Sequence, residues 1–385
     1  MTHPIIIATI MRPEGETGVQ THFNALIDYL NANDQPVELI TPYSAPLWLV
    51  YPLFAVRKLL KGPLSVWWYR YWHAFFVEMA LIKRLKNDSP GTVYAQCPLS
   101  ANAALNAKVS NKQRVVMVTH FNISQAEEWA GKGMIDKTDK LYQSIQNFEE
   151  TVLPRMDGLV FVSEFMKQEL LKRIPAICNV NATVVPNFLA DPGLNTHTKT
   201  TADLINIGTL EARKNQSYLL DIIAALREQG TPLTLTIVGD GPDRSLLENK
   251  AKDLEITDLV SFAGFVANAA ALITSHKAYI HVAIIENLPV TLLEALARSC
   301  PIFAVPAGGV PEILNNNAVG LALPFNDAKS AAQTIANALK NQQWLLQTRI
   351  SSRETFLKKY SDTIAAENLY YFLKNTDSIT NIVKN

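Results

Sequence analysis

The chain has 385 residues, of which 48% are hydrophobic and 18% are charged, as in ordinary globular proteins. This length exceeds what a single hydrophobic core normally organises, so we expect two domains. Lys plus Arg and Asp plus Glu both number 35, and this balance excludes the global basic field typical of nucleic-acid binding. We therefore expect no nucleic-acid partner.

The three cysteines and the N-terminal stretch bear on the compartment. Cys97, Cys178 and Cys300 lie far apart, without a Cys-x-x-Cys pair or a His-rich neighbour. This spacing argues against a disulfide framework or a zinc site and indicates a reducing compartment. The first residues, MTHPIIIATIM, have no basic leader before their short apolar run, so they predict a strand rather than a secretion signal. We therefore expect a cytoplasmic protein.

Short apolar runs alternate with amphipathic stretches along most of the chain. Continuous apolar strands separated by helices are typical of parallel sheets covered on both faces. Two such sets predict an α/β fold of two Rossmann-like domains that face each other across a cleft. The expected strands are 5–10, 37–40, 92–96, 114–118, 158–162 and 183–185 in the first set, and 204–207, 233–238, 259–262, 278–282, 302–305 and 320–323 in the second.

The domain boundaries follow from changes in composition. Residues 185–201 are rich in Pro, Asn and Thr and lack periodicity, which predicts a linker. We accordingly place one Rossmann-like domain at 1–187 and a second at 188–355. The tail keeps a helical spacing of apolar residues, so we expect residues 356–385 to form a helix that packs back on the first domain.

Residues 48–86 interrupt the alternation and contain four of the six tryptophans. Between Arg57 and Lys86 there are seven Lys and Arg residues against one acid, Glu78. No uncharged run reaches the roughly 20 residues that a membrane-spanning helix needs. Basic residues interleaved with aromatic ones fit docking on an anionic membrane, which would place the protein peripherally on its inner face. A helical hairpin whose aromatic side chains fill the first domain's core fits the same pattern.

Two carboxylates stand out in residues 284–297, which read IIENLPVTLLEALA. Glu286 lies in a predicted strand-to-helix loop, and Glu294 lies about a turn and a half into a helix that a proline opens. In doubly wound sheets this loop is at the carboxyl edge, where ligands bind, and the amides of Asn287 and Leu288 would be free to donate. As an isolated pair, these acids also fit an ordinary solvated loop.

A pair of cations opens the first helix of the second half. Gly208 follows a predicted strand, and Arg213 and Lys214 stand at the start of the next helix. Positive side chains beside free helix-start amides suit a diphosphate, although routine surface charges fit the same two residues. Further tight turns follow later strands at Gly239 and Gly308.

Taken in order, IGTLEARKNQ, IVGDGP, FAGFV, ENLPVTLLEALA and AGGVPEIL resemble glycosyltransferase family 4, whose members have the GT-B fold. GETGVQTHF, VTHFN, FVSEFMKQEL and VVPNF in the first half resemble the same family. The resemblance covers 5–23 and 116–324 but not 46–85, where such enzymes vary with their acceptors. It implies a retaining hexosyltransferase that moves a sugar from a nucleotide sugar, such as a UDP- or GDP-sugar, to a glycan or lipid-linked acceptor in cell-surface polysaccharide or glycolipid synthesis. It also implies that the N-terminal domain, 1–187, binds the acceptor and that the C-terminal domain, 188–355, binds the nucleotide sugar.

The resemblance also implies residue roles without any metal ion. Glu294 would bind the ribose, and Lys214 would neutralise the leaving diphosphate. A lone histidine at a strand end, such as His120, is more often structural, but the resemblance points to a catalytic role. The transferred sugar would contact Glu286, Asn287 and Leu288, with His120 near the sugar and the acceptor. The diphosphate would contact Arg213, with Gly15 and Gly18 near the phosphates. The base would lie against Phe265 and Val266, and Gly208 and Gly239 would form turns of the donor site.

The chain departs from the family pattern at Thr209, where many members have Arg, and at Asn287, where many have Gly or Ser. One phosphate cation is then missing, and Arg213 is the candidate to replace it. The first loop reads GETGV where a glycine pair is frequent. A sugar-nucleotide epimerase, a glycosyl phosphorylase and a catalytically silent nucleotide-sugar-binding protein fit the same fold. A nicotinamide dehydrogenase does not, because no G-x-G-x-x-G follows the first strand of either half.

Overall fold

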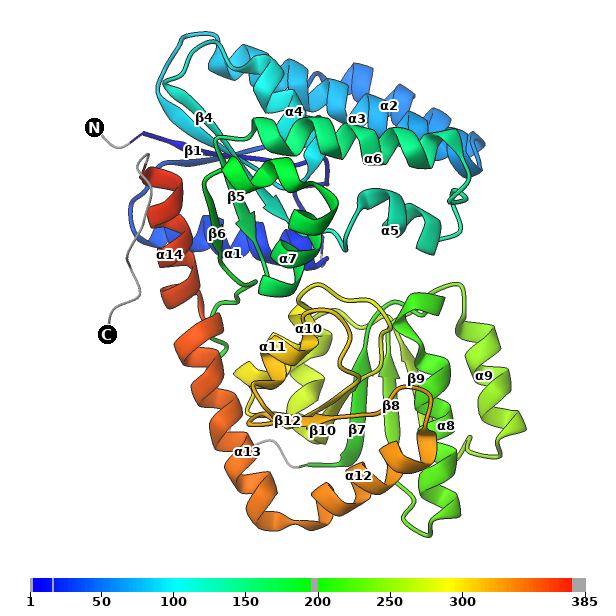
Figure 1. Ribbon diagram of the computed structural model, residues 1–385. Coiled ribbons are helices and arrows are strands. Elements are labelled where there is room, and N and C mark those ends of the chain that lie inside the picture. The colour runs from blue at the N-terminus through cyan, green and yellow to red at the C-terminus, as the bar shows by residue number, and fades with distance from the viewer. Residues whose placement is uncertain (1–2, 16, 195–199, 376–385) are drawn as a thin grey trace. The chain divides into compact units, whose positions relative to one another are not determined.

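The computed structural model describes residues 3–15, 17–194 and 200–375 of the chain. The chain divides into two compact units, one of residues 1–187 with 365–385 and one of residues 188–364. Each unit is built around a six-stranded parallel sheet with helices on both faces, so the expected α/β fold of two Rossmann-like domains is confirmed (Figure 1). Part of the predicted linker, 195–199, and the last ten residues of the predicted C-terminal helix segment lie outside the described residues.

The sheet of the N-terminal unit has the strand order β2-β1-β3-β4-β5-β6. The order reverses between β1 and β3, so ligands are expected at the carboxyl ends of these two strands. The strands are β1 (Ile5–Ala8), β2 (Val37–Ile40), β3 (Gly91–Ala95), β4 (Gln113–Thr119), β5 (Gly158–Phe161) and β6 (Ala182–Val184). The helices are α1 (Gly18–Ala32), α2 (Leu47–Val56), α3 (Gly62–Leu85), α4 (Pro98–Ala107), α5 (Gln125–Gly131), α6 (Lys140–Val152) and α7 (Glu164–Arg173).

The sheet of the C-terminal unit has the order β12-β11-β10-β7-β8-β9, and its reversal point lies between β7 and β10. The strands are β7 (Ala202–Ile207), β8 (Leu235–Val238), β9 (Val260–Gly264), β10 (His276–His281), β11 (Ile302–Ala304) and β12 (Gly320–Ala322). The helices are α8 (Gln216–Glu228), α9 (Arg244–Asp253), α10 (Val290–Ala297), α11 (Val310–Leu314), α12 (Ala328–Lys340) and α13 (Gln342–Thr355). The last helix, α14 (Asp362–Lys374), belongs mostly to the N-terminal unit.

All twelve predicted strands are present, each within about two residues of its expected bounds. They were predictable because a strand buried on both faces is a continuous apolar run. In β1 and β4, for example, nearly every side chain is buried.

The C-terminal segment changes unit near the start of α14. Before this point Arg353 pairs with Asp191 at 2.6 Å, within the C-terminal unit. From residue 365 on, α14 belongs to the N-terminal unit, where the Thr92 hydroxyl donates to the Leu373 carbonyl at 3.0 Å. The Tyr370 hydroxyl also donates to the Gln35 side chain at 2.6 Å.

Residues 48–86 form the helical hairpin of α2 and α3. Some of its aromatic side chains pack in the interior. Trp68 donates from Nε1 to the Leu53 carbonyl at 2.7 Å, and Trp72 packs against the buried Phe76. Others lie on the surface, where Trp48 and Trp67 are 75% and 46% exposed. The aromatic side chains of the hairpin are therefore divided between the core and the surface.

The basic residues of the hairpin also divide between core and surface. Arg70 is buried and donates to the Gln125 side chain at 2.9 Å, so its assignment to a basic surface was wrong. Its aliphatic stem is covered within the unit, which the local spacing of charges could not indicate. Arg84 pairs with Glu38 at 2.5 Å and is partly neutralised. Over the described residues, no helix combines the length and apolar character needed to cross a membrane.

Candidate functional site

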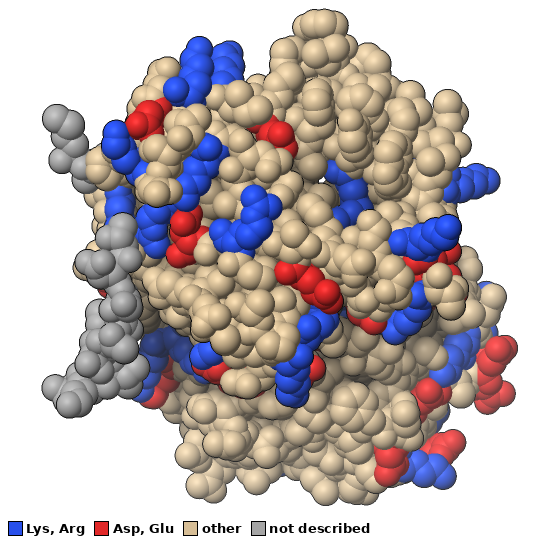
Figure 2. Space-filling model, turned by 45° about the horizontal axis from the view of Figure 1, so that its top comes forward, with Lys and Arg blue, Asp and Glu red and all other residues tan. Residues whose placement is uncertain are grey.

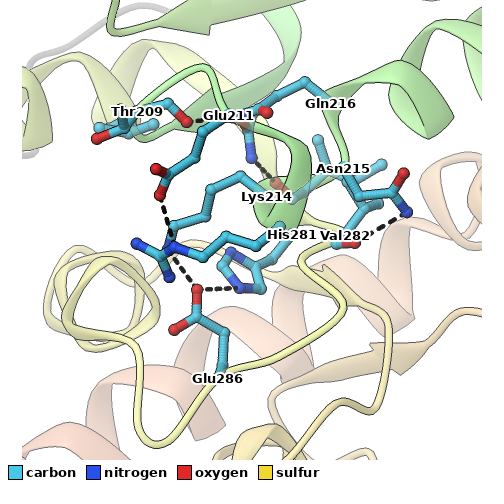
Figure 3. A network of polar contacts seen from close by, with 12 residues as sticks. Thr209, Glu211, Lys214, Asn215, Gln216, His281, Val282 and Glu286 are labelled. Carbon is cyan, nitrogen blue, oxygen red and sulfur yellow. Dashed lines mark hydrogen bonds and ion pairs between the residues drawn. The ribbon is translucent and has the colours of Figure 1, made fainter. Parts of the chain in front are cut away.

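The polar site of the C-terminal unit lies where β7 and β10 end side by side, at the reversal point of the sheet. Lys214 ends a short 3-10 turn after β7, and Glu286 follows β10. The Lys214 Nζ forms an ion pair with the Glu286 Oε1, as Figure 3 shows. The sheet topology thus brings together two side chains that lie 72 positions apart in the sequence.

The loop that carries Lys214 is held by its own polar contacts. Asn215 has a φ of 56°, the left-handed conformation that lets the turn end and α8 begin at the next residue. The Gln216 side chain donates to the Thr209 carbonyl at 3.0 Å. The Ile284 amide donates to the Arg213 carbonyl at 3.0 Å and so ties the loop after β7 to the loop after β10. We had not predicted roles for Asn215 and Gln216, although Asn before a helix is a recognisable signal for this conformation.

Glu286 is buried and remains ionised. Burial by itself raises the pKa of its carboxyl, but the charge of Lys214 and the neighbouring His281 outweigh this effect and hold the pKa at about 2. The His281 Nε2 lies 3.5 Å from Glu286 Oε1 (Figure 3). Burial lowers the pKa of His281, so this histidine is a neutral neighbour at physiological pH. At this point of the site, therefore, one carboxylate, Glu286, is paired with one ammonium group, Lys214.

Arg213 faces a different partner from Lys214. Its Nε lies 2.6 Å from the Glu211 carboxylate, and both side chains are largely covered. The positive charge that we expected to replace the missing cation at Thr209 is thus partly balanced within the same turn. A negatively charged ligand would have to compete with the Glu211 carboxylate for the Arg213 guanidinium.

The second glutamate lies on α10, which begins at Val290, one residue after the proline that we expected to be the first helical residue. Glu294 is half-buried, and the Arg298 guanidinium donates to its backbone carbonyl at 3.1 Å. Asn287 and Leu288, in the loop before the helix, are both buried. The placement of Glu286 before α10 and Glu294 within it agrees with the sequence analysis.

The glycine after β8 is required by the packing of the loops that follow β7 and β8. A Cβ at Gly239, whose φ is +134°, would lie 2.0 Å from the Gly208 carbonyl oxygen. Any larger residue at Gly239 would therefore separate the ends of two adjacent strands. At Gly208 itself a Cβ would meet nothing within 4 Å.

The loop after β9 presents an apolar side chain to solvent. Phe265 is 72% exposed, and Val266 beside it is half-buried. The Gly239 amide donates to the Gly264 carbonyl at 2.8 Å, so this loop is joined to the one after β8. An exposed aromatic ring at the carboxyl edge of a sheet is available for stacking on a planar ligand.

In the N-terminal unit the loop between β1 and α1 is organised by Gln20. Its side-chain nitrogen donates to the carbonyls of Arg12 and Glu14 at 3.0 and 2.7 Å. Its oxygen accepts from the amide of Thr17, the N-cap of α1, at 3.2 Å. Gly15 has a φ of +150° and leaves no space for a Cβ beside the Gln20 carboxamide. Gln20 is therefore a structural residue of this loop that the sequence analysis missed.

The first helical residue after this loop, Gly18, is exposed at the N-terminus of α1. A glycine here leaves the helix-start amides uncovered by a side chain. The geometry is compatible with the expected approach of a phosphate to this end of the helix.

His120 follows β4 at the carboxyl edge of the N-terminal sheet. Its Nε2 donates to Gln96 Oε1 at 3.1 Å, because the Gln96 nitrogen is engaged with the Tyr94 carbonyl at 3.3 Å. This tautomer leaves Nδ1 as an acceptor. Burial, followed by the nearby ring of His22, lowers the pKa of His120 well below its ordinary value. His120 is therefore a neutral hydrogen-bonding group at physiological pH.

Within the part of the chain that the structure describes, no three His, Cys, Asp or Glu side chains gather as they would around a metal ion.

Solved structures of similar fold extend over nearly the whole chain. A sucrose-phosphate synthase from Thermosynechococcus elongatus has a TM-score of 0.71 at 14% identity, covering 96% of this chain and 98% of that one. Anabaena HepE, in complex with UDP and glucose, has a TM-score of 0.68 at 14% identity, covering 97% of this chain and 99% of that one. These likenesses show that the fold is the GT-B fold.

The family follows from the sequence. "Glycosyltransferase Family 4" matches residues 17–190, and "Glycosyl transferases group 1" matches residues 192–355. The two matches together span most of the chain, which therefore belongs to the family 4 glycosyltransferases. The expected family is thereby confirmed.

Curated relatives cover shorter parts. A GDP-mannose-dependent alpha-(1-6)-phosphatidylinositol monomannoside mannosyltransferase from Mycobacterium tuberculosis is 28% identical over 187 residues, which are 46% of this chain and 48% of that protein. An N-acetyl-alpha-D-glucosaminyl L-malate synthase from Bacillus anthracis is 27% identical over 146 residues, 37% of this chain and 38% of that protein. The chain thus spans about half the length of these relatives or less.

Proposed function

We propose that this protein is a retaining glycosyltransferase that moves a sugar from a nucleoside-diphosphate sugar to a hydroxyl of a glycan or lipid-linked acceptor. The observation that carries the proposal is the Lys214–Glu286 pair at the reversal point of the C-terminal sheet. In this proposal the diphosphate lies against Lys214 and Arg213, the ribose against Glu294, and the sugar against Glu286, Asn287 and Leu288. Cell-surface polysaccharide or glycolipid synthesis is the process that uses such a transfer.

The chemistry follows from the charges of the site. As the bond between the anomeric carbon and the diphosphate breaks, negative charge grows on the leaving oxygen, and the Lys214 ammonium stabilises it. The acceptor hydroxyl attacks from the same face, and its proton passes to the departing phosphate. No carboxylate nucleophile is required, because Glu286 is already engaged by Lys214 and His281. The mechanism uses protein cations in place of a metal ion.

The donor test uses thermal shifts with a panel of UDP- and GDP-sugars, followed by transfer assays. Glu294→Gln is expected to weaken nucleoside-diphosphate binding by about 1.5–3 kcal/mol, since a hydrogen bond to a charged group is lost. Calorimetry measures this change, and Glu248→Gln on α9 is the control because Glu248 pairs only locally with Arg244 at 2.9 Å. Wild-type affinity in Glu294→Gln would overturn the ribose assignment.

Product analysis separates the remaining alternatives. We expect transfer with retention of the donor's anomeric configuration. NMR of the product measures this configuration. An epimerised nucleotide sugar formed from donor alone would instead identify an epimerase, and release of a sugar 1-phosphate from a glycan with phosphate would identify a phosphorylase. Donor binding without any turnover would identify a silent binding protein.

Docking on an anionic membrane surface is the second part of the proposal, and it would place the protein on the inner face of a membrane. It is supported by the hairpin face, which we define as the exposed aromatic side chains Trp48, Tyr51, Trp67, Tyr71 and Phe75 of α2 and α3. Exposed aromatic rings anchor at the level of lipid headgroups, and basic residues add about 1 kcal/mol each near an anionic surface. In Figure 2 the upper right of the visible face is largely uncharged, and Lys and Arg gather at its left.

Vesicle co-sedimentation tests this docking. We expect the protein to bind vesicles that contain phosphatidylserine, with binding that falls as salt rises. Trp67→Ser combined with Lys61→Glu should reduce binding at least about 30-fold, since an anchor and about 1 kcal/mol or more of attraction are lost. The matched control is Phe325→Ser with Lys340→Glu, which changes an exposed aromatic and an exposed lysine in the other unit. Equal recovery in the supernatant with and without anionic vesicles would favour a soluble acceptor.

A further inference from the structure

A cleft of ≈ 680 Å³ opens in the N-terminal unit, on the side of the sheet's carboxyl edge. It is bounded by the loop after β1, by Tyr43 after β2, and by the α2–α3 hairpin. The described residues that line it all belong to this unit, so the cleft shares no described residue with the Lys214–Glu286 site. Gly15, which we expected near the donor phosphates, lies in its wall.

Three cations line the cleft, and one acid, Glu14, lines it with them. Arg12, Arg57 and Lys58 come from two separate segments, the β1 loop and the end of α2. None of these three makes an ion pair with a carboxylate among the described residues. Among the lining residues that the structure describes, cations therefore outnumber acids three to one, in a protein whose net charge is zero.

The two guanidinium groups are held by aromatic rings and not by acids. The Arg57 guanidinium lies 4.3 Å from the centroid of the Tyr69 ring. Arg12 lies 5.9 Å from the centroid of Tyr43, and its Nε donates to the Tyr43 hydroxyl at 3.2 Å. Stacking orients an Arg side chain while leaving most of its N–H donors available for an anion.

The rest of the wall is a stack of flat side chains. The ring of Phe54 stacks on His73 with centroids 3.9 Å apart, and Tyr69 lies 4.0 Å from the same imidazole. The His73 Nδ1 is engaged by the Tyr69 carbonyl at 2.8 Å. His73 is therefore part of the aromatic wall, and the positive charge of the cleft comes from Arg12, Arg57 and Lys58.

We propose that this cleft binds the acceptor of the reaction, and that this acceptor carries a doubly charged anionic group. The inference rests on the proposed function and adds the chemical class of the second substrate. A group with two negative charges can contact the cations of both segments at once, whereas a neutral glycan would leave three cations facing an uncharged ligand. The aromatic wall then contacts the sugar ring or apolar part that bears the anion.

Two chemical sources provide such a dianion, a phosphate ester and a dicarboxylate, and the phosphate can be free or borne by a lipid. Arg57 and Lys58 directly follow α2, which also carries Trp48 and Tyr51 of the hairpin face. An anionic group displayed at a lipid surface would therefore reach the cleft from the face proposed for membrane docking.

Calorimetry with the full chain tests the cleft directly. The probes are glucose 1-phosphate, succinate and neutral glucose, and we expect the anions to bind more tightly than glucose. Arg57→Gln and Lys58→Gln are each expected to weaken anion binding by about 10-fold or more, since a hydrogen bond to a charged group is lost. Arg155→Gln is the matched control, because Arg155 is exposed in the same unit and does not line the cleft. Lys58 is exposed, so its variant retains a folded protein even if Arg57→Gln does not.

The sources are separated by a second arm. Phosphatidylcholine vesicles that carry dodecyl phosphate are compared with vesicles of phosphatidylcholine alone, for wild type and Lys58→Gln. Binding that depends on both the phosphate and Lys58 supports a lipid-borne phosphate. If glucose 1-phosphate binds more tightly than succinate, the source is a soluble phosphate. If succinate binds more tightly than glucose 1-phosphate, the source is a dicarboxylate.

Three results would overturn the inference. These are equal affinity for glucose and the anions, absence of anion binding, and anion binding that Lys214→Gln removes while Arg57→Gln and Lys58→Gln leave it intact. The last result would place the anion at the C-terminal site. Failure of the proposed function is a separate observation, because it is the absence of nucleotide-sugar binding or transfer, with or without a ligand in this cleft.

Discussion

The Lys214→Ala variant is expected to turn over at least about 100-fold more slowly than the wild type. This factor corresponds to the loss of one charge contact with the leaving diphosphate in the transition state. The variant also leaves the buried Glu286 without its cation, so some loss of stability is expected at neutral pH. The sign follows from the pKa of about 2, which lies below the ordinary value, so the pairing stabilises the fold above about pH 4.5 and less as the pH falls toward 2.

Initial rates at a temperature well below unfolding measure this effect. Lys250→Ala is the matched control, because Lys250 also pairs with a carboxylate, Asp221 at 2.8 Å, in the same unit. A Lys214→Ala variant as active as Lys250→Ala would contradict the proposed mechanism. Arg213→Ala is an informative companion, since a large loss of rate would mean that the diphosphate draws this side chain away from Glu211 and that it replaces the cation missing at Thr209.

The Glu149→Ala variant is expected to lose about 3–5 kcal/mol of unfolding free energy, because it removes one partner of a buried ion pair. Glu149 on α6 has no exposed side-chain surface and lies 2.7 Å from Arg173 at the end of α7. Its oxygens also accept from the Ser124 hydroxyl and the Gln125 amide, both at 2.8 Å, at the start of α5. The substitution therefore leaves a cation and two donors without their acceptor.

Chemical denaturation of Glu149→Ala and Glu150→Ala measures the difference. Glu150 is the next residue on the same helix and is exposed, so its variant should lie within about 0.5 kcal/mol of the wild type. Equal stability of the two variants would show that the buried pair contributes nothing. The double variant Glu149→Ala with Arg173→Ala should lose less than the sum of the two single variants, since neither charge is left alone.

The same network has a functional consequence. Ser124 caps α5 and lies four residues after His120, so the Glu149 contacts hold the loop that carries this histidine. We therefore expect Glu149→Ala to lower turnover as well as stability if His120 acts at the reacting sugar.

The sequence by itself determined the strands, the two-domain division of the fold and the family. Each of these depends on local information, because a strand covered on both faces is apolar throughout and a motif is a short stretch in a fixed order. The loop positions of Glu286 and Lys214 after their strands were predictable for the same reason. The start of α10 was predictable to within one residue, since Pro289, expected as its first residue, is its N-cap.

Only the tertiary structure decided which distant side chains meet and which face of a helix is covered. Lys214 and Glu286 form a pair because β7 and β10 are neighbours, and strand order is not written in the residues of either strand. The burial of Arg70, the network around Glu149 and the joining of Arg12 to Arg57 in one cleft depend on the way α3, α6 and the β1 loop pack on the N-terminal sheet. Such contacts join segments far apart in the chain, so neither local spacing nor composition carries a signal for them.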